Sequence, residues 1–356
     1  MLRRAALIRQ ANPHRAHLKP SASIRTQPED FVVEEIPMYP ALGTGGHVFI
    51  VVRKTNWSTP ACIRQIAKVL GIKSDDIGHA GMKDRHARTT QTLSIPWPEE
   101  KNLPSFDWGI EGIEVLSAQR HPHKLRVGHL IGNRFRIKLC DIAKENMQTI
   151  KSGLHEIGKV GVPNAYGPQR FGKDGDNAQR ALGWLRGEYR GPKNKSTRRL
   201  LQSSVQSMLF DRLLHYRVRN GTWNTVVEGD LVKTFDRGGL FMTEHPQTDA
   251  RRALVGEVTA TGPIFGSKMR WPGGEPAKWE RNVVDEVLGG PDALGGLKKL
   301  GVGCRRALRI LPQDFRVEYS EQNDQPLVDV SMTLPKGAYA TTVLGAVFQL
   351  RDASFR

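Results

Sequence analysis

Apolar and polar residues alternate along several short stretches of the chain, which is the pattern of strands with one buried face. The clearest stretch covers residues 133–139, where Phe135, Ile137 and Leu139 face one way and arginine and lysine side chains face the other. A second alternating stretch covers residues 328–334, near the C-terminus. Each pattern predicts a strand that packs its apolar face on a core.

A further strand is predicted at residues 47–53, which are rich in β-branched and aromatic residues. Residues 59–70 then show apolar residues at helical spacing on one face. Thr59 is a plausible N-cap, Pro60 suits the first turn, and Gly71 can end the helix. The pattern therefore predicts an amphipathic helix directly after the strand.

The alternating pattern disappears between about residue 161 and residue 310. Residues 161–200 are rich in Gly, Asn, Lys and Arg, residues 203–216 have a helical pattern, and residues 229–243 suggest a hairpin. Alternation returns only after this stretch. A second domain inserted into the first explains that order.

The charge of the chain points to its partner. There are 53 Lys and Arg against 36 Asp and Glu, a formal net charge of +17. Such a field favours a polyanion, with nucleic acid the first candidate and an anionic membrane surface the second. The sequence contains no apolar run close to the roughly 20 residues of a spanning helix, so we expect no membrane insertion.

The three cysteines, Cys62, Cys140 and Cys304, lie far apart and form no CxxC pair. This spacing argues against a structural zinc site and against a disulfide framework. It fits packing residues of a protein in the reducing cytoplasm.

The first 28 residues contain several arginines and no acidic residue. Such a start is typical of a mitochondrial transit peptide or of a flexible basic arm that touches phosphates. Because the rest of the chain is also basic, we interpret residues 1–27 as an arm.

One carboxylate, Asp84, lies in a segment of cations that includes Lys83, Arg85 and Arg88. Nearby cations favour the ionised form of a carboxylate, and an ionised, well-held carboxylate can act as a nucleophile. Local composition alone fits a solvated surface loop better, because most charge clusters are solvated.

Two other clusters combine cations with rings. Residues 120–129 hold Arg, Lys and His and suit a phosphate backbone or a basic exposed sheet face. Their histidines lack a Cys or carboxylate partner at a recognised spacing, so we expect no metal site. Residues 164–172 contain Tyr166, Arg170 and Phe171, which can stack on unpaired bases or pack in a turn.

Five segments, in order along the chain, resemble the TruD family of tRNA pseudouridine synthases. The family's hallmark is G-x-K-D-x-x-A-x-T-x-Q, matched here by Gly81, Lys83, Asp84, Ala87, Thr89 and Gln91. The other four matches are Pro28-Glu-Asp-Phe-Val-Val33, Gly132-Asn-Arg-Phe-Arg-Ile137, the segment from Val162 to Gly172, and Leu334-Pro-Lys-Gly-Ala-Tyr-Ala-Thr341. The resemblance covers most of the chain.

The resemblance implies an α+β fold. A pseudouridine synthase catalytic domain with a curved, mainly antiparallel mixed sheet would carry an inserted TruD-specific α/β domain, with RNA in the cleft between them. The expected boundaries are a basic arm at 1–27, the catalytic domain at 28–160 and 308–356, and the inserted domain at 161–307.

The implied reaction is the isomerisation of uridine to pseudouridine in tRNA, at position 13, with Asp84 as the catalytic nucleophile. The resemblance implies no metal, nucleotide or redox cofactor. Phe31, Asn133 and Tyr339 would contact the target uridine. Phe135 would take the place that a tyrosine holds in other pseudouridine synthase families.

Two further residues complete the expected substrate-binding set. Lys83 is the motif residue beside the nucleophile, and Arg25 stands where the family pattern has lysine, which keeps a cation but changes its geometry. Tyr339 also departs from the pattern, which has phenylalanine there. Ala165 replaces an aromatic residue in the match from Val162 to Gly172, which weakens a stacking role there.

We expect a cytoplasmic monomer whose partner is tRNA. The main alternative is a non-catalytic RNA-binding or ribosome-associated protein, which explains the charge but not the Lys83-Asp84 motif. A metal-dependent nuclease is a weaker alternative, because it needs a cluster of carboxylates.

Overall fold

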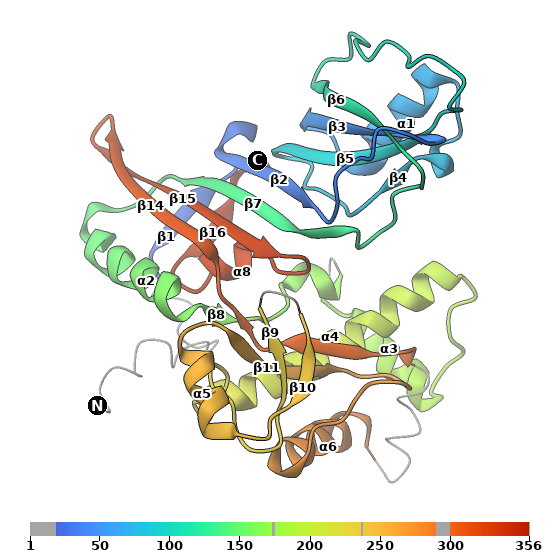
Figure 1. Cartoon of the computed structure of the whole chain (residues 1–356). Coiled ribbons are helices and arrows are strands. Elements are labelled where there is room, and N and C mark those ends of the chain that lie inside the picture. The colour runs from blue at the N-terminus through green and yellow to red at the C-terminus, as the bar shows by residue number, and fades with distance from the viewer. Residues whose placement is uncertain (1–18, 173–174, 236–237, 290–299, 356) are drawn as a thin grey trace. The chain divides into compact units, whose positions relative to one another are not determined.

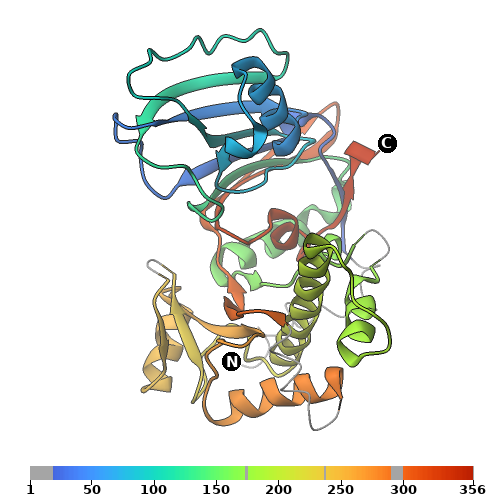
Figure 2. The same ribbon diagram turned by 90° about the vertical axis from the view of Figure 1, so that its right-hand side faces the viewer.

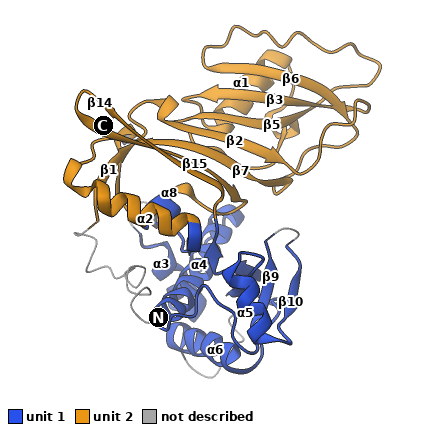
Figure 3. Ribbon diagram, turned by 60° about the vertical axis from the view of Figure 1, so that its left-hand side comes forward, with its two compact units in different colours: residues 1–18, 159–311, 341–346 blue, residues 19–158, 312–340, 347–356 orange. Residues whose placement is uncertain are grey.

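The structure is a computed structural model that describes residues 19–172, 175–235, 238–289 and 300–355. The chain divides into two compact units (Figure 3). Unit 2 comprises residues 19–158, 312–340 and 347–356, and unit 1 includes residues 159–311 and 341–346. Residues 1–18 of the expected basic arm lie outside the described residues.

Unit 2 is built on an eight-stranded sheet of order β14-β15-β7-β2-β5-β3-β6, with β4 paired to β5 (Figure 1). Only the β2–β5 pair is parallel among these neighbours. The strands are β2 (Phe31–Pro37), β3 (His47–Thr55), β4 (Gly78–His79), β5 (Arg88–Pro96), β6 (Ile113–His121), β7 (Leu130–Leu139), β14 (Gln313–Gln322) and β15 (Gln325–Pro335).

The two alternating stretches form neighbouring strands. On β7 the side chains of Phe135, Ile137 and Leu139 are buried, whereas Arg134 and Arg136 are exposed. β15 pairs antiparallel with β7 and buries its own apolar row, residues 328, 330, 332 and 334. Both predicted strands are therefore confirmed, together with the faces they bury.

Helix α1 (Thr59–Leu70) lies against the sheet in both views (Figures 1 and 2). Its apolar face packs on the buried side chains of β3 and β5. The N-cap is Ser58, whose hydroxyl accepts a hydrogen bond from the Ala61 N–H, so the expected cap at Thr59 is wrong by one residue. Gly71 ends the helix in the left-handed conformation, φ 65°, as expected.

A short strand, β1 (Ser21–Ile24), pairs in parallel with β16 (Gln349–Asp352), near the other end of the chain. Ser23 also bridges to Cys140, just after β7. The expected arm at 1–27 is corrected here, because residues 22–24 are buried in unit 2. Four residues are too few to show a period in the sequence, and their partner strand is remote.

Unit 1 has its own sheet and core. The sheet order is β10 (Leu240–Met242), β9 (Leu231–Thr234), β11 (Val258–Ile264) and β12 (Cys304–Ala307), and a separate pair joins β8 (Val162–Pro163) to β13 (Arg309–Ile310). The β9–β10 hairpin falls within the predicted residues 229–243. The long helix α4 (Lys195–Arg219) packs beside α3 (Asn177–Arg186) and α6 (Gly274–Leu288) (Figure 2). Apolar side chains of these three helices form the largest part of this core.

The remaining elements have the following bounds. The unit 1 strands are β8 (Val162–Pro163), β9 (Leu231–Thr234), β10 (Leu240–Met242), β11 (Val258–Ile264), β12 (Cys304–Ala307) and β13 (Arg309–Ile310). The helices are α2 (Met147–Val160), α3 (Asn177–Arg186), α4 (Lys195–Arg219), α5 (Pro246–Leu254), α6 (Gly274–Leu288) and α8 (Ala340–Leu344). In the part of the chain that the structure describes, none of these helices is long and apolar enough to cross a membrane.

Candidate active site

All seven residues of the expected site belong to unit 2, although they come from remote parts of the sequence. They are Arg25, Phe31, Lys83, Asp84, Asn133, Phe135 and Tyr339. The structure connects most of them through direct contacts that involve β1, β2, β7 and the loop between β4 and β5.

Asp84 lies in that loop, and its side chain is 45% exposed. The Nη2 of Arg25 donates to Asp84 Oδ1 at 2.8 Å, and its Nη1 donates to Asp352 Oδ2 at 2.5 Å. Arg25 follows β1 directly and has φ 58°, a left-handed conformation that is uncommon for a side chain of this size. The β1–β16 pairing brings Arg25 and Asp352 together, so the guanidinium that binds Asp84 is also held by Asp352.

The guanidinium of Arg25 also lies over the ring of Phe31, 4.0 Å from its centroid. This is cation–π geometry. Phe31 is 2% exposed and meets the ring of Phe135 edge-on, with the centroids 6.3 Å apart. In this structure the Phe31 ring supports Arg25, and a base could stack on it only after Arg25 moves.

Lys83 is turned into the protein. Its Nζ lies 2.5 Å from Glu35 Oε2, and both side chains are almost fully buried, 4% and 1% exposed. The second oxygen of Glu35 accepts a hydrogen bond from the Thr92 N–H at 3.1 Å. A buried pair with its remaining acceptor satisfied fixes geometry, so Lys83 anchors the loop beside Asp84.

The main chain of this loop is held from helix α1. The Lys83 N–H donates to Thr59 Oγ1 at 2.9 Å, and that hydroxyl donates to Gln91 Oε1 at 2.8 Å. Because Ser58 and not Thr59 caps helix α1, the Thr59 hydroxyl is available to bind the motif residues Lys83 and Gln91.

Asn133 extends the buried row of β7 beyond Phe135 and lies opposite Glu35 of β2. Its Oδ1 is buried without a hydrogen-bond partner among the described residues. Such an acceptor is costly unless something else pairs with it, which a substrate N–H can do. The preceding Gly132 has a packing role, because a Cβ there would lie 2.2 Å from the Leu334 carbonyl oxygen.

Tyr339 lies between β15 and α8 and is half-buried. Within the described residues its side chain has no hydrogen bond or ring contact, so no such contact connects it to the Asp84 cluster. Residues that reasoning from the sequence missed are Glu35, Thr59, Asp352 and Lys54. Glu35 carried a signal: it falls on the apolar side of the β2 alternation, with Phe31 and Val33.

The basic cluster at residues 120–129 is in part structural. The guanidinium of Arg120 donates to the carbonyl oxygens of Gly45, Trp97, Pro98 and Lys101. The ring of His121 is buried and stacks on the rings of Tyr39 and Phe49, and this burial lowers its pKa. Among the described residues, no group of three His, Cys, Asp or Glu side chains could hold a metal ion.

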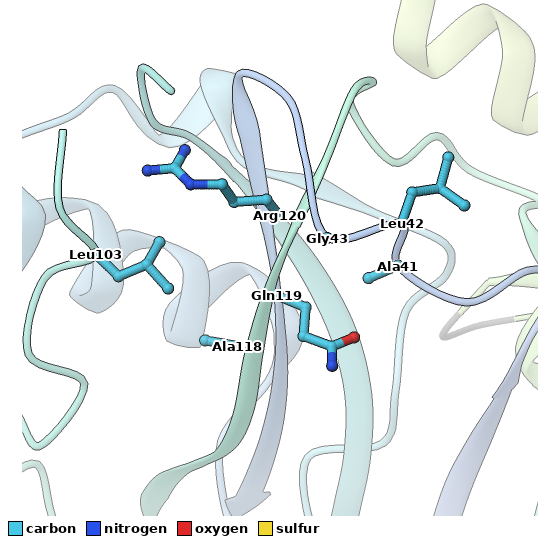
Figure 4. A pocket seen from close by; sticks show the side chains of 7 residues that line it. All are labelled: Ala41, Leu42, Gly43, Leu103, Ala118, Gln119 and Arg120. Atoms are coloured by element: carbon cyan, nitrogen blue, oxygen red, sulfur yellow. The ribbon is translucent and has the colours of Figure 1, made fainter. Parts of the chain in front are cut away.

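An open pocket of about 490 Å³ lies beside Arg120 (Figure 4). It is lined by Ala41, Leu42, Gly43, Leu103, Ala118, Gln119 and Arg120. Because Arg120 is its only titratable residue and is already engaged with carbonyls, the pocket offers no catalytic group.

Comparison with known proteins supplies the family. The profile of the family described as "tRNA pseudouridine synthase D (TruD)" matches residues 19–189 and 193–347. The chain belongs to the TruD family. A tRNA pseudouridine synthase D of Anaeromyxobacter sp. (strain Fw109-5) is 39% identical over 335 residues, covering 90% of this chain and 91% of the relative. A tRNA pseudouridine synthase D of Thermus thermophilus is 37% identical, covering 92% and 88%.

A solved structure agrees at the level of the fold. The crystal structure of a putative tRNA pseudouridine synthase D (TruD) from Methanosarcina mazei has a TM-score of 0.68 to this chain, at 22% sequence identity, and covers 95% of both chains. At that identity the likeness concerns the fold alone. The α+β fold expected from the TruD resemblance is thereby confirmed.

The TruD motif at residues 162–172 lies in unit 1. The ring of Tyr166 has the Arg306 guanidinium 4.1 Å from its centroid and meets Phe210 edge-on at 5.8 Å. The Arg170 guanidinium lies 5.4 Å from the same ring. With these neighbours in place, the motif packs a loop on helix α4, which fits the packing interpretation better than a stacking surface.

Proposed function

We propose that this protein isomerises a uridine of tRNA to pseudouridine, at position 13, with Asp84 as its catalytic nucleophile. The observation that carries the proposal is a solvent-accessible carboxylate on a rigid support. Asp84 is exposed, yet the side chain of Arg25, which binds it, is only 12% exposed and is also paired with Asp352. Membership in a family named for tRNA pseudouridine synthesis gives the class of reaction.

The reaction rearranges bonds without losing atoms. The bond between the ribose C1′ and N1 of uracil breaks, the base turns, and C1′ bonds to C5 instead. The proton on C5 leaves and N1 gains one, so the balance needs no oxidant, nucleotide or other cofactor. Asp84 could take part by attacking the sugar, by attacking the base or by removing a proton, and each route requires an ionised carboxylate that is held in place.

The other residues would hold the base and the carboxylate. The target base must leave its stack, at a cost of a few kcal/mol. The unpartnered Oδ1 of Asn133 is suited to accept the N3–H of uracil. Phe135 and Tyr339 would provide apolar and aromatic contacts to the base, and Phe31 would join them once Arg25 leaves its ring. Before that step, Arg25 would hold the Asp84 carboxylate, and Lys83 would anchor the adjoining main chain.

The partner in this proposal is tRNA, and the net charge of +17 supports it. We also propose that the protein acts as a monomer in the cytoplasm. The free cysteines Cys62, Cys140 and Cys304 suit a reducing compartment. Light scattering with and without tRNA would test the monomer, since a mass of two chains at micromolar concentration contradicts it.

The test is chemical mapping of pseudouridine. Unmodified tRNA with uridine at position 13 is incubated with the protein without added metal or nucleotide, beside the same tRNA with cytidine there. We expect one pseudouridine, at position 13, in the first tRNA only. A pseudouridine elsewhere would contradict the position. Tight tRNA binding without any pseudouridine would favour a non-catalytic RNA-binding protein.

A further inference from the structure

Lys54 lies at an apolar position of strand β3. The residues before it on the same face are Val48, Ile50 and Val52, and all four side chains are fully buried. The three valine and isoleucine residues pack on helix α1. A lysine is almost never fully buried unless a charge partner compensates it, so this position calls for an explanation.

The ammonium of Lys54 has carbonyls as partners instead of a carboxylate. Its Nζ donates to the Trp57 carbonyl oxygen at 2.5 Å and to the Asp84 carbonyl oxygen at 2.9 Å. Among the described residues, no carboxylate oxygen forms an ion pair with it. This contrasts with Lys83, the other buried lysine of the region, which pairs with Glu35.

A purely structural role accounts poorly for this arrangement. Holding the Trp57 carbonyl would need only a neutral donor, whereas an ammonium without a carboxylate is costly to bury. Burial lowers the pKa of Lys54 to about 8, against the pull of the Asp84 charge, which raises it. Natural proteins keep such unfavourable groups mainly where function needs them.

We propose that Lys54 is a positioning residue that holds Asp84 from its main-chain side while Arg25 holds its carboxylate. The inference rests on the proposed function of Asp84. Three contacts then fix this loop: Lys54 Nζ to the Asp84 carbonyl, the Lys83 N–H to Thr59, and Arg25 to the Asp84 carboxylate. The buried ammonium also places a positive charge close enough to the Asp84 carboxylate to interact with it.

The charge on Lys54 gives the proposal a pH signature. The groups that face the ammonium are Asp84 and Lys83 from the loop and Cys62 from helix α1. Burial raises the pKa of the Cys62 thiol to about 11, so that group stays neutral near pH 8. Loss of the Lys54 proton above about pH 8 should therefore slow the reaction.

Folding stability should respond in the opposite direction. The folded pKa of Lys54 is below its ordinary value of 10.5, so the unfolded chain binds more protons between about pH 8 and 10.5. The contribution of this group to the free energy of unfolding therefore rises with pH across that window. A fall in activity over the same window cannot then be attributed to this lysine weakening the fold.

The experiment compares Lys54→Met with Lys68→Met, which removes an exposed lysine of helix α1. Methionine keeps the length of the buried stem and removes both donor and charge. We measure the single-turnover rate on saturating tRNA, the Kd for tRNA, and urea denaturation. We expect Lys54→Met to lose about 10- to 100-fold in rate, the scale of a hydrogen bond to a charged group, with Kd within about twofold. Lys68→Met should match the wild type.

The pH profile separates positioning from a structural role. The wild-type rate should fall above about pH 8, and this fall should be absent from the residual activity of Lys54→Met. An unchanged rate in Lys54→Met, or an unchanged pH profile, overturns the proposal. If Lys54→Met does not fold, the wild type decides: a rate that stays level from pH 7.5 to about pH 9.5 contradicts the proposal, and a decline while stability holds supports it.

Asp84→Asn, run in parallel, distinguishes the two levels of inference. If that variant retains wild-type activity, the proposed role of Asp84 fails. If it is inactive while Lys54→Met is fully active, only the role of Lys54 fails.

Discussion

Two carboxylates of this protein have the same kinds of neighbours and different surroundings. In unit 2, Asp84 binds Arg25, whose guanidinium lies over Phe31 at 4.0 Å. In unit 1, Asp211 lies near an arginine, Arg306, whose guanidinium lies over an aromatic ring at 4.1 Å. Asp84 is 45% exposed in a loop, whereas Asp211 is partly buried on helix α4.

The two carboxylates differ in how accessible they are to solvent and in what their hydrogen bonds do. Asp211 accepts a hydrogen bond from the Tyr166 N–H at 3.0 Å and thereby ties the TruD motif at residues 162–172 to α4. Burial raises its pKa to about 7, although that hydrogen bond and the Arg306 charge both act to lower it. Asp84 keeps an open side and has a fixed cation on the other. An arginine and an aromatic ring therefore accompany both carboxylates, and of the two Asp84 is the more exposed to solvent.

The largest expected effect on stability is at Asp211. Its folded pKa of about 7 is above the ordinary value of 3.8, so the stability that it contributes is present below pH 3.8 and is lost as the pH rises through 7. Asp211→Asn keeps an acceptor for Tyr166 and removes this dependence. We expect it to raise the free energy of unfolding at pH 8 by roughly 1–4 kcal/mol, the scale of a shift of this size.

Urea denaturation at pH 5 and pH 8 measures this, with Asp84→Asn as the matched control. Because Asp84 is exposed, we expect its variant to stay within about 0.5 kcal/mol of wild type at both values. If Asp84→Asn changed stability as much as Asp211→Asn, the contrast between the two carboxylates would be lost.

The next effect concerns the two arginines. Arg25→Gln removes the cation that fixes Asp84, and we expect the single-turnover rate to fall about 10- to 100-fold, the scale of a charge-assisted hydrogen bond. Arg25→Lys keeps the charge but cannot span Asp84 and Asp352, so its rate should be intermediate. Arg306→Gln should leave the rate of the folded protein within about threefold of wild type. Equal losses of rate in Arg25→Gln and Arg306→Gln would contradict the special role of Arg25.

The smallest effect concerns tRNA binding by the exposed face of β7. Arg136 is exposed there, and its removal should weaken tRNA binding only modestly. If it contacts a phosphate, Arg136→Gln should make the slope of log K against log salt shallower by about one. Lys278→Gln, in unit 1, is the control, because Lys278 already pairs with Glu275 at 2.6 Å. Identical salt slopes in all three proteins would remove β7 from the proposed RNA surface.

The sequence predicts the regular parts of unit 2 well. The rows of β7 and β15 lie where alternation places them, because one face of each strand packs on a core. The helix at residues 59–70 has the predicted bounds, but its N-cap is Ser58 and not Thr59. The sequence did not distinguish these neighbours, because serine and threonine both suit an N-cap.

The support of the site was harder to predict. Arg25 depends on β1 pairing with β16, and a four-residue parallel pair between the two ends of the chain leaves no local signal. Glu35 and Lys54 did leave one, since each is a charged residue at an apolar position of a strand. A search for alternating apolar residues misses charged residues on the buried face, although a buried charge is the more informative observation.

In the proposed reaction the exposed carboxylate of Asp84, and not the partly buried one of Asp211, performs the chemistry. The most direct test is the single-turnover formation of pseudouridine in saturating tRNA by Asp84→Asn, with Asp211→Asn beside it. We predict a loss of at least about 10³-fold for Asp84→Asn, with tRNA binding intact, and a rate within about threefold of wild type for Asp211→Asn. Wild-type pseudouridine formation by Asp84→Asn would contradict the account.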